Sequence, residues 1–160
     1  AQRPGSGKAW AGPLRLARLA PRRHGCAMPY YDAYLIPISP AKLDAYRDFS
    51  RRIGAVYLEY GAVRIVDVLL DDQGGDGASF HAEEARAALD EGLRDFPAAA
   101  GAVEGETVIL SWTEWPDKQA RDEGLAKVLA DPRVQPDPED GVIFEGRRLV
   151  SGAFIPLASL

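Results

Sequence analysis

Residues Glu106–Trp115 read ETVILSWTEW, a run that predicts an extended strand with apolar side chains on both of its faces. One face carries Val108, Leu110, Trp112 and Glu114, and the other carries Ile109, Ser111, Thr113 and Trp115. The segment Ala62–Leu70 (AVRIVDVLL) has the same character. In a sheet built from these two strands, both faces must therefore be shielded from water by other parts of a protein.

The residues before this pair of strands predict a strand followed by a long helix. Tyr30–Ile38 (YYDAYLIPI) is rich in aromatic and branched residues, as strands are. Ser39 is expected to be the N-cap of the helix and Pro40 its first residue. Apolar residues then recur at helical spacing as far as Tyr60, and Gly61 supplies a left-handed C-cap.

The residues after Glu106–Trp115 repeat that order. Pro116-Asp117 ends the strand and caps a helix over Lys118–Ala130, which Asp131-Pro132 stops. Residues 133–146 are expected to form a loop, and Arg147–Pro156 (RRLVSGAFIP) a fourth strand.

An insertion separates the two halves. Asp71–Gly77 (DDQGGDG) is expected to be a loop, and His81–Phe96 a short surface helix that Pro97 ends. Ala98–Gly105 then forms a loose connector to the third strand.

This order predicts an α+β fold of the ferredoxin-like βαββαβ type, with a four-stranded antiparallel sheet and an extra helix inserted between strands 2 and 3. Two helices cover one face of such a sheet. The other face would leave an apolar patch in water, which monomeric soluble proteins avoid. We therefore expect a homodimer in which two sheets pack face to face.

Composition narrows the class of protein. The 160 residues suit one domain, and no apolar run is long enough to span a bilayer. Residues 1–27 hold six Lys and Arg and no acid, so residues 28–160 carry a net charge of −11, which argues against nucleic-acid binding. Because regular patterning begins directly after Met28, we expect 1–27 to be a disordered N-terminal extension and 28–160 to be the domain. Arg15 and Arg18 interrupt the apolar residues of that extension, so it lacks the core of a secretory signal, and we expect a cytoplasmic protein.

Several short motifs occur in an order typical of one family. They are Met28-Pro29-Tyr30-Tyr31-Asp32, Gly61-Ala62-Val63-Arg64-Ile65-Val66, Ser111-Trp112-Thr113-Glu114-Trp115-Pro116-Asp117-Lys118, Arg121-Asp122, Asp131-Pro132-Arg133 and Phe144-Glu145-Gly146-Arg147-Arg148-Leu149. Over residues 28–160 the chain resembles the YbaA-like family of uncharacterised bacterial proteins. The resemblance implies a dimeric α/β-barrel fold and brings no established activity. Residues 71–105 are longer here than the family pattern, and they carry the extra helix.

Charged residues gather around the end of the third predicted strand. Glu114, Asp117, Arg121 and Arg133 are candidates for an anion or carboxylate site, with Glu114 as a general base. The spacing of four residues also lets Arg121 pair with Asp117 along the helix. The same residues also have a purely structural interpretation, which we favour. In it they are a capping acid, a solvated ion pair and an arginine that holds the Pro132 loop.

Aromatic and charged residues on the strands form a second set of candidates. Tyr34 and Trp112, with three further aromatic residues (Tyr57, Tyr60 and Trp115), fit an aromatic pocket or, equally, a core or dimer interface. Arg64 and Asp67 lie on opposite faces of one strand, so one of them points into a buried layer. That residue is a polar anchor in a pocket, half of a salt bridge across the dimer interface, or a charge that protects an edge strand against aggregation, and the sequence leaves all three open.

No motif fixes a reaction. Besides a purely structural or interaction module, two functions remain. The first is a small-molecule-binding or sensor-like homodimer, with Tyr34, Arg64, Asp67, Trp112, Glu114, Arg121 and Arg133 as candidate ligand-binding residues. The alternative is a cofactor-less enzyme, of the oxygenase or isomerase type, acting on a small organic substrate. One cysteine and two histidines make a Cys/His metal site unfavourable, and we expect neither a metal nor a cofactor.

Overall fold

The computed structural model describes residues 28–71, 95–135 and 141–158. Its strands and α-helices are β1 (Tyr30–Ile38), α1 (Leu43–Glu59), β2 (Arg64–Leu69), α3 (Phe96–Ala100), β3 (Thr107–Trp115), α4 (Lys118–Ala130) and β4 (Val150–Phe154). Short 3-10 turns lie at Pro40–Lys42, Pro132–Val134 and Gly146–Arg148. The four predicted strands and the two long predicted helices are thus confirmed, although the fourth strand is shorter than Arg147–Pro156.

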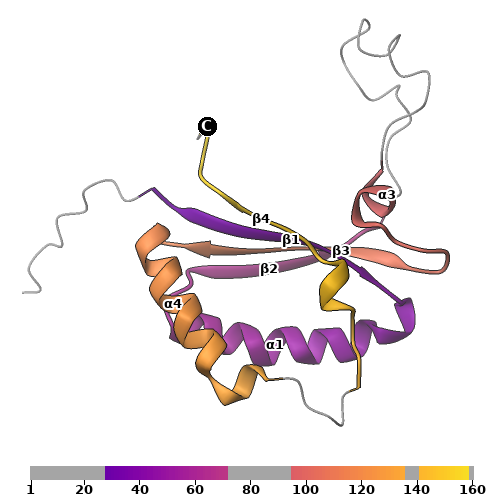
Figure 1. The fold of residues 1–160 in the computed structure, drawn as a ribbon, viewed down its shortest axis with the longest axis horizontal. Coiled ribbons are helices and arrows are strands. Elements are labelled where there is room, and N and C mark those ends of the chain that lie inside the picture. Colours follow the sequence, from indigo (N-terminus) through magenta and orange to yellow (C-terminus); the bar gives the residue numbers. More distant parts are fainter. Residues whose placement is uncertain (1–27, 72–94, 136–140, 159–160) are drawn as a thin grey trace, which may run out of the picture.

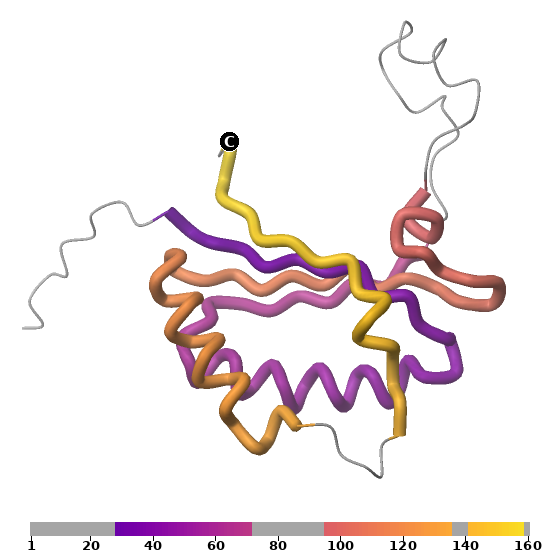
Figure 2. Tube along the Cα trace, viewed as in Figure 1, coloured from indigo at the N-terminus to yellow at the C-terminus, as the bar shows by residue number. Residues whose placement is uncertain are grey.

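The four strands form one antiparallel sheet in the order β2-β3-β1-β4. β3 and β1 form the centre, where Tyr34 lies opposite Ser111. β2 is an edge strand, and its Asp67 lies opposite Ser111 on the other side of β3. Figure 2 shows β1 and β4 running alongside each other at the opposite edge. The expected α+β class with an antiparallel sheet is confirmed.

Local signals place the helix ends. Gly61 follows α1 with φ of 102°, a left-handed conformation in which a Cβ atom is strained. The Asp117 carboxylate accepts a hydrogen bond of 2.7 Å from the Ala120 N–H, which confirms Asp117 as a capping residue. Ser39 is the N-cap of the 3-10 turn that precedes α1, and Pro40 lies in its first turn, as predicted, although the Ser39 hydroxyl makes no capping bond.

Both long helices lie on the same face of the sheet (Figure 1). Trp115 at the end of β3 is fully buried there, and Ile38, Val56 and Val128 are also closed off from solvent. A cluster of aromatic rings fills the space towards the other end, where Phe49 and Phe144 have their ring centroids 5.6 Å apart. The core therefore lies between the helices and the sheet.

The insertion differs from its prediction. Most of the expected helix His81–Phe96 lies outside the described residues, and so does most of the loop Asp71–Gly77. In the described part, Pro97 begins a helix instead of ending one, because proline fits the first turn of α3 after the Asp95 N-cap. Residues expected to form only a loose connector thus include part of a helix.

The opposite face of the sheet carries no long helix in the described part of the chain (Figure 1). Most of the side chains on this face are apolar. The apolar ones are Tyr31, Ala33, Leu35, Val66, Val68, Leu110, Trp112, Val150 and Phe154. We call this set the open face. Val68 and Phe154 are 42% and 55% exposed, whereas Val108, at the end where α3 packs, is fully buried. In the described part of the chain, α3 thus covers one end of the open face, and residues such as Val68 and Phe154 lie outside that cover.

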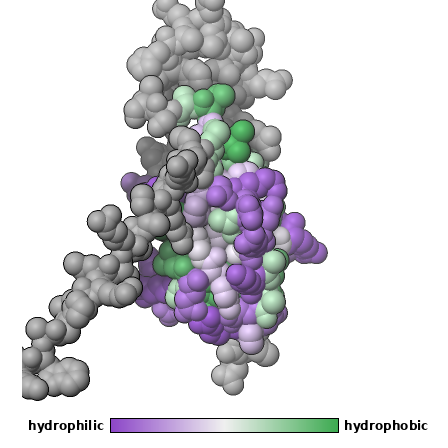
Figure 3. Space-filling model, turned by 90° about the vertical axis from the view of Figure 1, so that its left-hand side faces the viewer, coloured by the Kyte–Doolittle hydropathy of each residue, from purple (hydrophilic) through white to green (hydrophobic). Residues whose placement is uncertain are grey.

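The end of the molecule that lies on the left in Figure 1 has a more hydrophilic surface than the open face. Figure 3 views the structure from one end of the sheet, and hydrophilic residues predominate over the described part of that surface, with smaller hydrophobic patches between them. This end of the molecule is therefore suited to contact with water, whereas the open face is mainly apolar.

Candidate functional site

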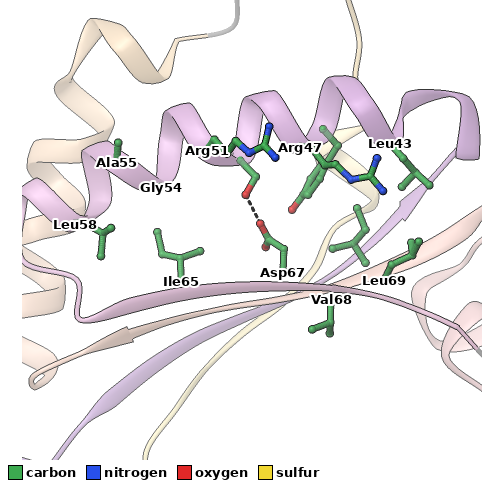
Figure 4. A pocket seen from close by; sticks show the side chains of 13 residues that line it. Leu43, Arg47, Arg51, Gly54, Ala55, Leu58, Ile65, Asp67, Val68 and Leu69 are labelled. Carbon is green, nitrogen blue, oxygen red and sulfur yellow. Dashed lines mark hydrogen bonds between the residues drawn. The ribbon is translucent and has the colours of Figure 1, made fainter.

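A cavity of about 530 Å³ lies between α1 and the edge strand β2. Ligand pockets commonly have volumes of about 300–1,000 Å³. Its walls are mostly apolar, and the apolar lining residues are Leu43, Gly54, Ala55, Leu58, Ile65, Val68, Leu69 and Ile109. Its polar lining residues are Tyr46, Arg47, Ser50, Arg51 and Asp67. Figure 4 shows α1 above the cavity and β2 below it, with Ile65 and Leu69 directed towards the helix and Val68 away from it.

Asp67 is the polar group of β2 that points into this space. The Ser50 hydroxyl donates a hydrogen bond to Asp67 Oδ2, drawn as a dashed line in Figure 4. The other oxygen, Oδ1, is buried and has no hydrogen-bond partner. A buried acceptor without a partner costs about 1–3 kcal/mol, and more when it is charged. Such an atom is unusual in a native structure, where buried polar groups normally pair with protein atoms or ordered water.

Three tyrosines, Tyr34, Tyr46 and Tyr57, line a smaller cavity of about 160 Å³, which shares Ser50 and Asp67 with the larger one. Burial raises the pKa of the Tyr34 phenol to about 12. Burial also raises the pKa of Tyr46 and Tyr57, and the nearby carboxylate of Asp67 adds to the effect on Tyr46. All three phenols are therefore neutral at pH 7.

The Tyr46 phenol lies next to Asp67. Burial first, and then the Asp67 charge and a side-chain hydrogen bond to Asp67, raise the pKa of this phenol. Asp67 Oδ1 is closed off from solvent and meets no partner at normal hydrogen-bond geometry.

The structure separates the predicted site residues into groups. Tyr34 and Asp67 lie on the helix-facing side of the sheet and line the cavities. Arg64, Trp112 and Glu114 lie on the other side, where Arg64 Nη2 and Glu114 Oε2 are 3.2 Å apart. The aromatic set is also divided, because Trp112 lies on the open face while Trp115 is in the core.

Arg121 does not pair with Asp117, contrary to the helical spacing argument. Its guanidinium binds both oxygens of Asp32 on β1, with its Nη2 2.8 Å from Oδ1. Asp32 also accepts a bond of 3.1 Å from the Trp115 indole N–H. The Asp117 carboxylate caps the start of α4, and Arg121 pairs with the nearby buried carboxylate of Asp32 instead.

Arg133 lies in the turn after α4. It donates to both oxygens of Asp131 and to both oxygens of Glu59 at the end of α1. The hydrogen bonds from Arg133 hold the pKa of the Asp131 carboxyl below its usual range. This geometry matches the structural interpretation, in which Arg133 holds the Pro132 turn, and it places Arg133 outside the cavity.

Sequence reasoning missed the α1 side of the cavity. Tyr46, Ser50 and Gly54 are spaced by four residues and so share one stripe of the helix. A serine and a glycine within an otherwise apolar stripe were the available signal, because they leave space and a hydroxyl where a core helix would place large side chains.

The described residues contain no group of three or more His, Cys, Asp or Glu side chains placed to hold a metal ion. No helix in the described ranges has the length and apolar character needed to span a bilayer.

The fold and the cavity define an α+β protein with an antiparallel sheet and a ligand-sized space beneath its edge. The chain belongs to the family described as "Protein of unknown function (DUF1428)", which matches residues 29–146. It is 32% identical over 127 residues to the uncharacterised protein YbaA of Escherichia coli K12, covering 79% of this chain and 95% of YbaA. YbaA of Shigella flexneri matches with the same identity and coverage.

Among solved structures, the chain has a TM-score of 0.47 and 12% identity to SnoaB, a cofactor-independent oxygenase from Streptomyces nogalater. The match covers 84% of this chain and 98% of SnoaB. A likeness of this size establishes neither a shared fold nor a shared activity.

Proposed function

We propose that this protein binds a small organic molecule in the cavity between α1 and β2. The observation that carries the proposal is a largely apolar cavity of about 530 Å³ that is lined by Asp67 and by Ser50, whose hydroxyl donates to the Asp67 carboxylate. Ligand sites are commonly apolar cavities with a few placed polar groups. This combination favours a binding role.

The test compares two substitutions at Gly54, which lines both cavities. A Cβ atom at this position meets only Ile65 Cδ1, at 3.6 Å, so Gly54→Ala fits without strain. Gly54→Leu extends a larger side chain into the cavity. Wild type and Gly54→Ala are incubated with metabolite mixtures, washed, and analysed by mass spectrometry for retained compounds. We expect retention by both and its loss in Gly54→Leu, and equal retention by all three would contradict the proposal.

The alternative function is an enzyme that needs no cofactor. A specific observation favours it, because the Asp67 carboxylate lines an apolar cavity, where a carboxylate is suited to take a proton from a bound substrate. In an isomerase, Asp67 would remove a proton from one carbon of the substrate and return it to another. The same incubations distinguish the two functions, since retention without any change in the compounds would exclude the enzyme.

We further propose that the protein forms a homodimer through the open face, in a ferredoxin-like, dimeric α/β-barrel arrangement. The support is the bare apolar surface of β1, β2, β3 and β4, on which Val150 is 45% exposed. Burying apolar area contributes about 25 cal/mol per Å². Arg64 and Glu114 at its edge provide the polar rim that interfaces usually have.

Light scattering on the full chain tests the dimer. Trp112→Glu places a charge on the open face, and Leu129→Glu places the same charge on the exposed side of α4. We expect wild type and Leu129→Glu to be dimers at micromolar concentration and Trp112→Glu to be a monomer. A monomeric wild type would exclude the sheet-paired arrangement. The cytoplasmic location remains a prediction from sequence.

A further inference from the structure

The smaller cavity, of about 160 Å³, lies beside the α1–β2 cavity, and we call it the tyrosine cavity. We infer that the ligand places a neutral carbonyl oxygen in the tyrosine cavity, where the phenols of Tyr34 and Tyr57 donate hydrogen bonds to it. This inference rests on the proposed binding function and specifies the polar group by which the ligand is recognised.

The phenol oxygens of Tyr34 and Tyr57 are available to a ligand. Both residues line the tyrosine cavity, and neither phenol forms a hydrogen bond with a residue in the described ranges. Within those ranges, Asp67 Oδ1 is the one side-chain oxygen or nitrogen that is both closed off from solvent and unpaired. The two unpaired phenol oxygens therefore retain contact with open space.

The two phenols are close together and both are donors. Burial raises the pKa of Tyr34, and the nearby Tyr57 phenol adds to this effect. Burial also raises the pKa of Tyr57, so both O–H groups keep their hydrogens at pH 7. A carbonyl oxygen carries two lone pairs and can accept both hydrogen bonds at once.

The carboxylate that lies near both phenols already has its own donors. Asp32 influences the pKa of Tyr34 and of Tyr57. Its Oδ1 is 2.8 Å from Arg121 Nη2, and its Oδ2 accepts at 3.1 Å from the Trp115 indole N–H. A partly buried O–H group without a protein acceptor favours an acceptor from a bound molecule.

The charges around the two cavities favour a neutral oxygen over a carboxylate. Arg47 and Arg51 line the α1–β2 cavity, but Arg47 pairs with Asp44 and Arg51 with Asp48. Among the described lining residues, no arginine or lysine is thus left without an acidic partner. The Asp67 carboxylate lines both cavities and disfavours a second negative charge.

The larger cavity would hold the apolar body of the ligand. The two cavities share five lining residues, which are Tyr46, Ser50, Gly54, Ile65 and Asp67. Gly54 has no side chain to divide the space, and a Cβ atom there would meet only Ile65 Cδ1, at 3.6 Å. An apolar ring system with one carbonyl group fits this distribution of polar and apolar walls.

The test measures the binding of three naphthalene probes to the full-length protein by equilibrium dialysis. They are the ketone 2-acetonaphthone, the hydrocarbon 2-isopropenylnaphthalene and the anion 2-naphthoate. The hydrocarbon has a CH₂ group in place of the ketone oxygen and nearly the same shape. We expect the ketone to bind about tenfold or more tightly than the hydrocarbon, since two neutral hydrogen bonds are worth that ratio. We expect the anion to bind more weakly than the ketone.

Tyr34→Phe and Tyr57→Phe each remove one hydroxyl and keep the ring. Each should lower the preference for the ketone about threefold, and the double variant should lower it to about onefold. Tyr60→Phe is the matched control, because the Tyr60 hydroxyl lies 3.0 Å from Asp131 and Tyr60 lines neither cavity. This control should keep the preference of wild type.

Infrared spectroscopy of 2-acetonaphthone bound to wild type gives a readout that needs no variant. The carbonyl stretch should lie at a lower frequency than in hexane, because hydrogen bonds weaken the C=O bond. An unshifted stretch would overturn the inference.

Each binding outcome decides one question. Equal binding of ketone and hydrocarbon to wild type, with both lost in Gly54→Leu, would overturn the carbonyl inference and keep the binding function. Tightest binding of 2-naphthoate would overturn the neutral class, and an unchanged preference in the double variant would overturn the role of the two phenols. Absence of binding by every probe would overturn this inference, and retained metabolites in the Gly54 experiment would then preserve the proposed function alone.

Discussion

Gly124→Ala is expected to destabilise the protein, although alanine is the better helix former. Gly124 is a buried residue of α4 that faces the core. A Cβ atom at this position would lie 2.4 Å from Trp115 Cζ3 and 2.6 Å from the Tyr60 carbonyl oxygen. Carbon atoms in contact normally lie about 3.5–4.0 Å apart. The ring or the helix must therefore move by about 1 Å.

Neither side has room for that movement. Trp115 is fully buried, and its indole N–H is held at 3.1 Å by Asp32. The other contact is backbone at the end of α1, which cannot rotate away as a side chain can. Overpacking a core costs about 1–3 kcal/mol, and two such close contacts favour the upper end. Helix propensity returns about 1 kcal/mol, which leaves a net loss of about 2 kcal/mol.

Urea denaturation followed by circular dichroism measures this loss. For a chain of this size, a net loss of about 2 kcal/mol lowers the melting temperature by roughly 4–8 °C. Gly146→Ala is the matched control, because a Cβ atom there meets nothing within 4 Å, and its effect should stay below about 0.5 kcal/mol. If Gly124→Ala were as stable as wild type or more stable, α4 would not pack as closely on Trp115 as described here.

Three further substitutions test other contacts. Asp32→Ala removes a buried carboxylate, 3% exposed, from the Arg121 guanidinium, and should cost about 3 kcal/mol in urea denaturation; a loss below about 1 kcal/mol would contradict a tight pair. The hydrogen bonds from Arg148 hold the pKa of Glu106 at about 2. The ionised Glu106 carboxylate therefore stabilises the fold fully above the unfolded-state pKa of about 4.3, and this stabilisation disappears as the pH falls towards 2. The free energy of unfolding should fall less steeply over this pH interval in Glu106→Gln than in wild type, and parallel curves would refute the pairing. Gly61→Ala should cost about 1–2 kcal/mol by thermal denaturation, because φ of 102° is strained for alanine even though space is free, and an unchanged melting temperature would argue against that conformation.

Local patterns in the sequence were sufficient for the elements and for the faces of the strands. Alternation along Glu106–Trp115 placed Trp112 and Glu114 together on one side and Thr113 and Trp115 on the other, as the register shows. The end of α1 before Gly61 followed from glycine's access to left-handed backbone, and the start of α4 from the capping carboxylate of Asp117. These features depend on residues a few positions apart, which sequence spacing describes directly.

Tertiary structure decided the partners of the charged residues and the location of the cavity. Arg121 found Asp32, 89 positions away, because β1 lies next to β3 in the sheet and α4 crosses below them. Ser50 and Asp67 lie together because β2 forms the edge beside α1, and that edge leaves the cavity that both residues line. Strand order and helix packing set such contacts over long separations, and periodicity along the chain contains no information about which distant residue becomes the neighbour.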